Sequence, residues 1–356
     1  MPARAEAEKG AGSVTGHGSG NLTPRPAAVS LDASSRAGRI DLVRRCLTRY
    51  SLLVLLVFLI VLYSILKPST FLTVTNIQSM LLQQTVPTVI ALAVLVPIVT
   101  GGFDLSVGYV LGFTAIVGAK VGASAIGGGL TAIAFLLVAG LAAGELNAIL
   151  VAKLRISSFI ATLGVGLSLS GIMLGLTAGQ VLYAGIPPVI AQISLTPILG
   201  VDASVWLTLI IVLLVYYLLA RLPLGRKMYA VGGNEQVARL AAIHVTRIKV
   251  IAFVLAGLLS AVGGLLTLGQ VGSADPSTGP EFLLPAFAAV FLGATSIRPG
   301  FFNVWGTVLA IFVLAVNFSG LTLLGAPYWI SPVIDGIVLV IGVLVAGKGL
   351  RGVLSG

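Results

Sequence analysis

The chain has 356 residues, of which 57% are hydrophobic and only 9% are charged. A soluble domain carries about 25% charged residues on average, so most of this surface must face something other than water. The net charge of +10 does not indicate a nucleic-acid-binding protein, because the basic residues lie at the ends of apolar runs and not on one continuous face. A single cysteine, Cys46, excludes internal disulfides, and the distant His17 and His244 form no cluster, so we expect no metal and no cofactor.

Residues 1–45 are rich in Gly, Ala, Ser, Pro and Arg and have no hydrophobic periodicity. Such a stretch cannot bury enough apolar surface to order itself, and it is too long and too polar for a secretory signal peptide. We expect a disordered cytoplasmic tail, followed by a transmembrane domain over residues 46–350.

Ten apolar runs follow the tail. A bilayer core about 30 Å thick needs about 20 apolar residues in a helix, and backbone groups in lipid must be satisfied within that helix. The sequence therefore predicts an all-α polytopic membrane protein with about ten transmembrane helices. The third and eighth runs are short for a full span, and short glycine-flanked runs are candidates for broken or re-entrant helices. The runs are Leu47–Leu66, Met80–Val99, Leu105–Val121, Leu130–Ala152, Ser158–Thr177, Val205–Ala220, Ile248–Leu268, Phe282–Ser296, Phe302–Leu324 and Ile330–Ala346.

The distribution of Lys and Arg predicts the topology of these runs. When the amino terminus is placed in the cytoplasm, the basic residues of the connections fall on the cytoplasmic side, and only Lys67 and Lys120 fall outside. This pattern predicts an even number of crossings with both termini in the cytoplasm.

The chain also repeats itself at an offset of 170 residues, where Asn147 aligns with Asn317 and Gly166 with Gly336. In this repeat, helices 2–5 correspond in order to helices 7–10. Each helix of the first group is therefore separated by five crossings from its counterpart in the second group. Because an odd number of crossings gives the two copies opposite orientations, we expect an inverted internal repeat with a solute path between its halves.

The connection over residues 221–249 is polar and reads RLPLGRKMYAVGGNEQVARLAAIHVTRIK. Its Gly233-Asn234-Glu235 segment is typical of a helix start with Asn as the cap, and Val237 and Leu240 follow with helical spacing. A short helix of this kind presents a compact surface to a partner protein. An ordinary basic loop is the alternative.

This connection resembles the cytoplasmic coupling segment of the ribose-type permease family of bacterial ABC importers, which is typically G-x-N-x-x-A-A-R-x-S-G-I. The chain keeps its size and register, with Ala241 and Ala242 where Ser and Gly are usual. In that family the segment docks into a groove on the ATPase subunit and transmits its closure. The resemblance implies a contact formed by Gly233, Asn234, Glu235, Ala238, Arg239 and Ala241.

Three further segments resemble the same family, and together the resemblance covers residues 50 to 350. They are Thr100–Gly108, similar to G-G-I-D-L-S-V-G, Leu292–Ser296, similar to L-G-G-T-S, and Pro327-Tyr328-Trp329. The glycine-rich stretch expected after the second segment is absent here. Branched-chain amino acid permeases share a related signature, so these motifs define the superfamily better than the solute.

The segment from Gly101 to Ser106 has two interpretations. Two glycines, Gly101 and Gly102, permit tight turning, and Asp104 and Ser106 can each cap the following helix. The same four residues are also candidates for gating or lining the solute path.

Polar residues within the runs are few. Glu145 and Asp335 are expensive in lipid and should face the bundle interior or a watery cavity. Asn147 and Asn317, if related by the repeat, approach the pseudo-symmetry axis where a neutral solute passes, and interhelical hydrogen bonding is their alternative role. Uncharged polar residues of the second run, and one residue before it, add to a lining that suits a neutral hydroxylated solute better than an ion; they are Gln83, Gln84, Thr85 and Asn76.

The chain has no G-x-x-x-x-G-K-[ST] phosphate loop, so ATP must be hydrolysed by a separate subunit. The resemblance implies a permease subunit in the bacterial plasma (inner) membrane that imports a sugar or similar small polar solute. Its implied partners are a cytoplasmic ABC ATPase subunit, an extracytoplasmic solute-binding protein and, because two ATPase sites need two coupling surfaces, a second permease in a homodimer or a mixed pair. The alternatives are an ion-coupled secondary transporter using Glu145 and Asp335, an ABC permease for branched-chain amino acids, and a lipid-modifying membrane enzyme, for which the chain offers no nucleophile–base pair.

Overall fold

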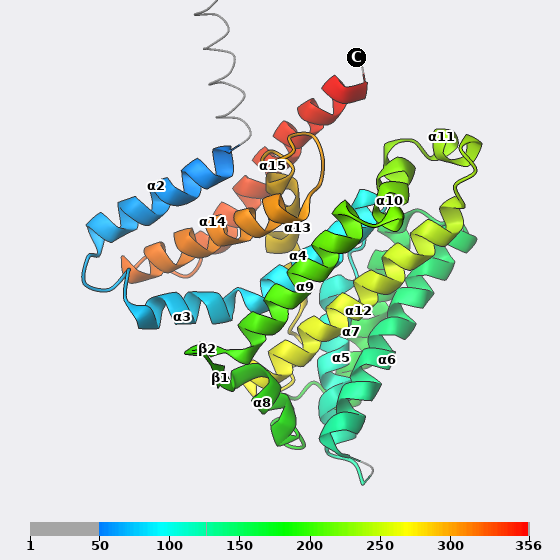
Figure 1. Cartoon of the computed structure of the whole chain (residues 1–356). Helices are drawn as coiled ribbons and strands as arrows, with labels where there is room; N and C mark the ends of the chain where they lie inside the picture. Colours follow the sequence, from blue (N-terminus) through cyan, green and yellow to red (C-terminus); the bar gives the residue numbers. More distant parts are fainter. Residues whose placement is uncertain (1–49, 126, 355–356) are drawn as a thin grey trace, which may run out of the picture. The chain divides into compact units, whose positions relative to one another are not determined.

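The computed structural model describes residues 50–125 and 127–354, which belong to one compact unit, residues 45–356. The expected tail, residues 1–45, and the start of the first apolar run lie outside the described residues. The described chain is built of helices, with one two-stranded hairpin formed by β1 (Pro197–Ile198) and β2 (Val201–Asp202) (Figure 1).

Each of the ten predicted runs coincides with a helical segment. Among the described residues, six segments are long and apolar enough to cross a membrane: α3 (Val74–Gln83) with α4 (Thr85–Val99), α6 (Gly129–Ala148) with the π-helix η1 (Ile149–Lys153), α7 (Ser158–Thr177), α9 (Ala203–Ala220), α12 (Val245–Val271) and α14 (Val304–Leu323). The shorter apolar segments are α2 (Ser51–Leu66), α5 (Val107–Gly122), η2 (Pro280–Phe282) with α13 (Leu283–Gly293), and α15 (Ile330–Leu354). The remaining helices are α8 (Pro188–Leu195), α10 (Pro223–Gly233) and α11 (Glu235–Leu240). This architecture confirms the predicted all-α polytopic membrane protein.

Helix α4 lies in the buried core of this unit. Its residues are apolar on every side, and all of them except Pro87 are buried. A helix without a polar face is stable only where neighbours or lipid cover all of its surface. Helices α12, α13 and α9 pack against α4, and α4 contributes more residues than any other helix to a large buried apolar cluster.

Helices α4 and α12 pack side by side and run in opposite directions. At one end, the Gln270 side-chain nitrogen donates a hydrogen bond of 2.7 Å to the Thr85 hydroxyl at the start of α4. At the other end, a Cβ atom added to Gly102, just beyond α4, would lie 3.1 Å from the Phe253 ring in the first half of α12. The start of each helix therefore lies beside the end of the other.

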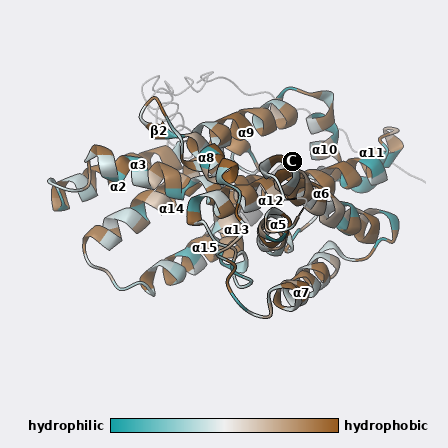
Figure 2. Cartoon of the chain, turned by 90° about the horizontal axis from the view of Figure 1, so that it is seen from below, coloured by the Kyte–Doolittle hydropathy of each residue, from teal (hydrophilic) through white to brown (hydrophobic). Residues whose placement is uncertain are grey.

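Large apolar side chains remain exposed on several helices. Phe58 of α2, Leu167 of α7 and Leu214 of α9 are each more than half exposed, at 59%, 58% and 62%. Hydrophobic residues run along the helices in Figure 2. Exposed apolar surface on this scale is typical of a protein whose outer face contacts lipid.

The order of elements from α4 to α7 is repeated from α12 to α15. The connection after the first helix of each half carries the same pattern, G-x-x-D-x-S-x-G, in Gly101–Gly108 and in Gly272–Gly279, 171 residues apart. Both segments begin with a left-handed glycine, at φ +80° and +69°. Because α4 and α12 are antiparallel, this repeat agrees with the predicted inverted arrangement.

The alignment of Asn147 with Asn317 is not supported by the helix boundaries. Helices α6 and α14 start at Gly129 and Val304, which are 175 residues apart, whereas the two asparagines are 170 apart. The connections of the two halves differ in length, so a single offset cannot hold along the whole repeat. Asn147 and Asn317 therefore occupy different positions along their helices.

Candidate functional site

The polar connection between α9 and α12 folds into two short helices, α10 and α11. As predicted, Asn234 caps α11, since its side-chain oxygen accepts hydrogen bonds from the amides of Gln236 and Val237 at 2.9 and 3.0 Å. These bonds satisfy two of the amides that a helix start leaves without partners. The cap therefore separates α11 from α10 and fixes where the new helix begins.

An ion-pair cluster ties α11 to the start of α12. The Glu235 carboxylate accepts a hydrogen bond from Lys249 at 2.6 Å and another from Arg239 on its own helix. The hydrogen bond from Lys249, followed by that from Arg239, holds the pKa of Glu235 below its usual range. The carboxylate is therefore ionised at neutral pH and positions α11 against α12.

One exposed side of α11 is apolar. Val237 is 59% exposed and Leu240 is 88% exposed, and Gly233 and Ala241 are also exposed. Ala238, which the family pattern includes in the contact, is only 2% exposed and faces the core. We therefore define the α11 face by Gly233, Val237, Leu240 and Ala241. The family pattern did not indicate Val237 and Leu240, although their helical spacing did.

The residue that ends α11 explains one departure from the family pattern. Ala242 has φ +57°, a left-handed conformation that glycine adopts without steric cost. The amides of Ala242 and Ile243 donate to the carbonyls of Arg239 and Ala238, both at 3.0 Å, which closes the helix end. The chain thus has a left-handed residue at the position where the family pattern has glycine.

The end of α10 touches the Gly101–Gly108 connection. A Cβ atom added to Gly232 would overlap the carbonyl oxygen of Val99 and lie 3.1 Å from the amide nitrogen of Gly101. Only glycine allows this approach between the two backbones. A polar recess of about 380 Å³ lies between the Gly101–Gly108 connection, α11 and the start of α12. Its lining includes Gly101, Gly102, Arg155, Ser158, Glu235, Arg239 and Lys249.

The side chains of Asp104, Ser106 and Asn147 form a buried polar network. One Asp104 carboxylate oxygen accepts hydrogen bonds from the Ser106 amide and hydroxyl at 2.9 and 2.6 Å, and the Asn147 amide donates to that hydroxyl at 2.7 Å. All three residues are at most 1% exposed. The Asn147 carbonyl oxygen has no hydrogen-bond partner among the described residues. The predicted capping of α5 is wrong for both residues. Asp104 accepts from the amide of Ser106, which precedes the helix, and the Ser106 side chain makes no bond to the first amides of α5.

The same connection is anchored to α7. The amide of Phe103 donates to the Ser158 hydroxyl, and that of Leu105 donates to the Thr162 hydroxyl, both at 3.0 Å. Three helices, α5, α6 and α7, are thereby joined through one short segment that also touches α10.

Glu145 does not face the bundle interior, which was one of the two surroundings predicted for it. Its side chain is 44% exposed and lies 3.5 Å from Lys153, at the end of α6 and η1. Side chains eight residues apart near a helix end can reach polar surroundings, so Glu145 needs no buried site. It is therefore separate from Asn147, in keeping with the opposite directions expected for these two side chains.

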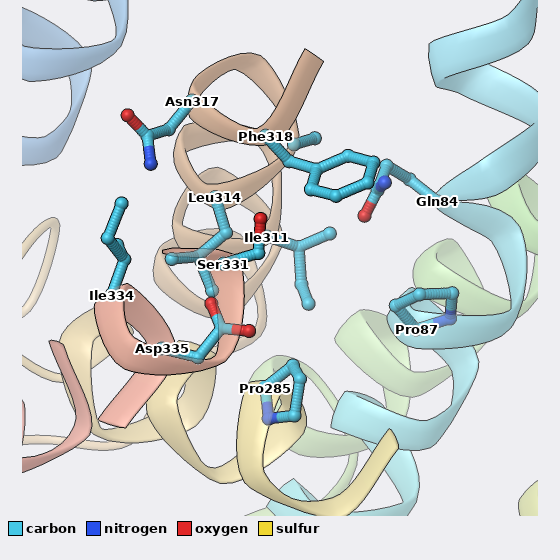
Figure 3. A pocket seen from close by; sticks show the side chains of 11 residues that line it. Gln84, Pro87, Pro285, Ile311, Leu314, Asn317, Phe318, Ser331, Ile334 and Asp335 are labelled. Atoms are coloured by element: carbon cyan, nitrogen blue, oxygen red, sulfur yellow. The ribbon is translucent and has the colours of Figure 1, made fainter. Parts of the chain in front are cut away.

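A second polar group of residues lines a cavity of about 130 Å³ between α4, α13, α14 and α15 (Figure 3). Gln84 comes from the break between α3 and α4, Asn317 from α14, and Ser331 and Asp335 from the first turns of α15. The Tyr63 hydroxyl of α2 donates to the Asn317 carbonyl oxygen at 3.0 Å. Asn317 and Asn147 thus lie in different polar environments.

Comparison with known proteins identifies the family. Residues 76–343 match the family described as branched-chain amino acid transport system / permease component. The chain belongs to this family. It is therefore a membrane-spanning permease subunit of an ABC importer, a component that is distinct from the importer's ATPase. Membership also agrees with a multi-pass protein of the inner membrane.

Individual relatives match over most of the chain. The ribose import permease protein RbsC of Escherichia coli strain K12 is 34% identical over 88% of this chain and 98% of its own length. The ribose import permease protein RbsC of Bacillus subtilis strain 168 is 35% identical over 82% and 91%. The autoinducer 2 import system permease protein LsrC of Salmonella paratyphi B is 34% identical over 80% and 81%. No solved structure matches this chain.

Proposed function

We propose that this permease imports a sugar or a similar small, neutral, hydroxylated solute, driven by ATP hydrolysis on a separate cytoplasmic subunit. The names of the relatives, which are ribose and autoinducer 2 import permeases, support this solute class. The main structural support for the mechanism is the α11 face, which is an exposed apolar surface. The hydrogen bonds of Asn234 and Glu235 position the helix that carries it.

The α11 face is the proposed docking surface for the ATPase subunit. Exposed apolar side chains outside the spans, such as Leu240, become stable when a partner covers them. Arg155, Arg239 and Lys249 line the neighbouring recess with only one acid, Glu235, so a partner surface with acidic residues is favoured there. Gly233, Asn234, Glu235, Arg239 and Ala241 remain contact candidates, whereas the buried Ala238 supports the helix from behind.

Movement of α11 has a short path into the membrane domain. The end of α10 touches the backbone at Val99 and Gly101, and this backbone continues into the Asp104–Ser106–Asn147 network. A displacement of α10 must therefore move Gly101 and Gly102 or break this contact. We propose that ATP-driven closure shifts this segment and changes solute access between the repeat halves.

The partners and orientation complete the proposal. Two ATPase sites require two coupling segments, so the working importer contains two permeases, as a homodimer or a mixed pair, together with an extracytoplasmic solute-binding protein. Both termini and the α11 face lie in the cytoplasm, as the distribution of basic residues predicts.

The orientation is tested by labelling. The variant Cys46→Ser, Leu240→Cys carries one thiol, on the most exposed side chain of the α11 face. A membrane-impermeant maleimide should label it in inverted vesicles and not in intact cells. Labelling in intact cells alone would place the α11 face outside, where no ATPase could dock.

The energy source is tested by transport. The permease is reconstituted in proteoliposomes with its ATPase subunit and solute-binding protein, and uptake of labelled sugars is followed. Uptake should need ATP and should continue when proton and sodium gradients are collapsed. Uptake that follows an ion gradient without ATP would instead favour a secondary transporter, for which Asp335, a partly buried residue, is the remaining one of the two carboxylate candidates. Uptake of leucine in place of sugars would favour the branched-chain amino acid alternative.

A further inference from the structure

The cavity in Figure 3 gathers hydrogen-bonding groups from segments far apart in the sequence. Gln84 lies on one side, at the break before α4, and Asn317, Ser331 and Asp335 lie on the other, on α14 and α15. A water molecule needs about 10–15 Å³ of such space, so a cavity of about 130 Å³ holds several waters or one small solute. The sequence indicated Gln84, Asn317 and Asp335 separately and did not predict that they meet.

Most polar side chains of this cavity make no bond to another part of the described protein. Among the described residues, the side chains of Gln84, Ser331 and Asp335 have no hydrogen-bond or ion-pair partner. Asn317 uses its carbonyl oxygen to accept from Tyr63, which leaves its amide N–H groups free to donate. Each of these four residues is partly buried. Polar groups in a membrane-spanning region are costly unless they find a partner, so four such residues on one cavity indicate a polar occupant.

The chemistry of the lining defines that occupant. Asp335 offers two acceptor oxygens, Asn317 offers donors, and Gln84 and Ser331 offer both. A carboxylate oxygen pair suits two neighbouring hydroxyl groups, and amide groups suit the remaining hydroxyl and ring oxygens. The apolar walls, Pro87, Pro285 and Phe318, can cover the carbon face of a sugar ring.

We propose that Gln84, Asn317, Ser331 and Asp335 form a low-affinity binding site for a neutral hydroxylated solute, a site within the permease itself that the solute occupies during import. The proposal rests on the proposed function and names a place where the same solute is held. The Asp335 carboxylate accepts hydrogen bonds from two neighbouring hydroxyl groups of the solute. Among the described side chains, no cation forms an ion pair with this carboxylate. A cationic solute is the competing occupant of such a site.

Binding to the purified permease in nanodiscs tests the site without the ATPase or the binding protein. Saturation-transfer NMR is recorded with D-ribose, D-xylose, D-glucose and myo-inositol as neutral probes and with choline as a cationic probe. At least one neutral probe should receive magnetisation from the wild-type protein. Asp335→Leu and Gln84→Leu should each weaken that binding about tenfold, the scale of one lost hydrogen bond to a charged or buried group. Gln180→Leu makes the same kind of change at an exposed position outside the cavity and should have no effect.

Asp335→Asn separates the two occupants, because asparagine keeps an acceptor oxygen and loses the charge. A hydroxylated solute should retain part of its affinity for this variant, whereas a cation should lose nearly all of it. Binding of choline in preference to every sugar, absence of binding by every neutral probe, or unchanged sugar binding in both leucine variants would each overturn the proposal. Melting temperatures of the variants establish that they are folded, and ATP-driven uptake by the wild-type importer reports separately on the proposed function.

Discussion

Gly108 and Gly279 occupy equivalent positions in the two repeat halves and touch each other through their backbones. A Cβ atom on Gly108 would lie 2.5 Å from the carbonyl oxygen of Gly279, and one on Gly279 would meet the Gly108 carbonyl oxygen even more closely. Each glycine ends a G-x-x-D-x-S-x-G segment, so the two connections of the repeat meet at their ends. The halves are therefore packed directly against each other at this point, with no room for a side chain.

The Gly108 contact predicts a destabilised variant. Gly108→Ala should lower the free energy of unfolding by about 1–3 kcal/mol, since a methyl group in this space forces the two connections apart. Gly164→Ala is the matched control, because it lies in a helix and nothing lies within 4 Å of its added Cβ atom. Thermal unfolding in detergent should show a lower melting temperature for the first variant and an unchanged or higher one for the second. Equal melting temperatures for Gly108→Ala and Gly164→Ala would mean that the contact between Gly108 and Gly279 has room for a methyl group.

The left-handed alanine after α11 predicts a stabilised variant. Ala242→Gly should relieve steric strain at φ +57° and raise stability by a few tenths to about 1 kcal/mol, the gain being limited by the greater backbone freedom of glycine when unfolded. The measurement is thermal unfolding together with solute-stimulated ATP hydrolysis by the assembled importer, which should be retained. Glycine at Ala241, whose φ is −81°, should be neutral or destabilising and serves as the control. A lower melting temperature for Ala242→Gly would contradict the assigned turn.

The ion pairs of Glu235 predict a charge-reversal effect. Glu235→Lys places a cation beside Lys249 and Arg239 and should release α11 from α12, reducing solute-stimulated ATP hydrolysis several-fold while the protein stays folded. The direct effect on stability should be small, about 1 kcal/mol or less, because these side chains are partly exposed. Adding Lys249→Glu should restore part of the stimulation. If the double variant is no better than the single one, the pair does not position α11.

The pKa of Glu235 also fixes the pH range in which this pair acts. Its hydrogen bonds lower that pKa in the folded protein, so the pair contributes fully above the ordinary carboxylate pKa and is lost as the pH falls through the lowered value. Coupling through Glu235 should therefore be constant across neutral pH.

The sequence predicted the membrane class and the helical segments well, because long apolar runs in lipid have few alternatives to a helix. It also predicted the Asn234 cap, whose side chain acts on amides two and three residues away. Such local rules do not show which face of a helix meets the bundle. That is why Ala238 was included in the docking surface and why the bundle interior was one of the two surroundings predicted for Glu145.

Long-range pairing was the weaker part of the sequence analysis. The repeat was read from Asn147 and Asn317, whereas the stronger signal was the G-x-x-D-x-S-x-G pattern at Gly101 and Gly272. Both copies of this pattern form the same turn, in which the amide of the serine donates a hydrogen bond to the carboxylate of the aspartate two residues earlier. The nitrogen–oxygen distance is 2.9 Å in the first copy and 2.8 Å in the second. The cavity around Asp335 depends on how four separate segments pack, and no pattern in the chain indicates that contact.

The buried network at Asn147 predicts a transport defect that is separate from docking. Asn147→Leu removes the donor to the Ser106 hydroxyl and leaves that hydroxyl with one partner fewer in a buried site, which should cost about 1–3 kcal/mol of stability. Because Asn147 is buried and does not belong to the α11 face, co-purification with the ATPase subunit should be unchanged while ATP-driven uptake falls about tenfold. Asn147→Asp keeps the size but adds a second carboxylate beside Asp104, so it should impair uptake at least as much. Gln180→Leu, at an exposed position, is the control. Normal uptake by Asn147→Leu would remove this network from the path between α10 and the solute.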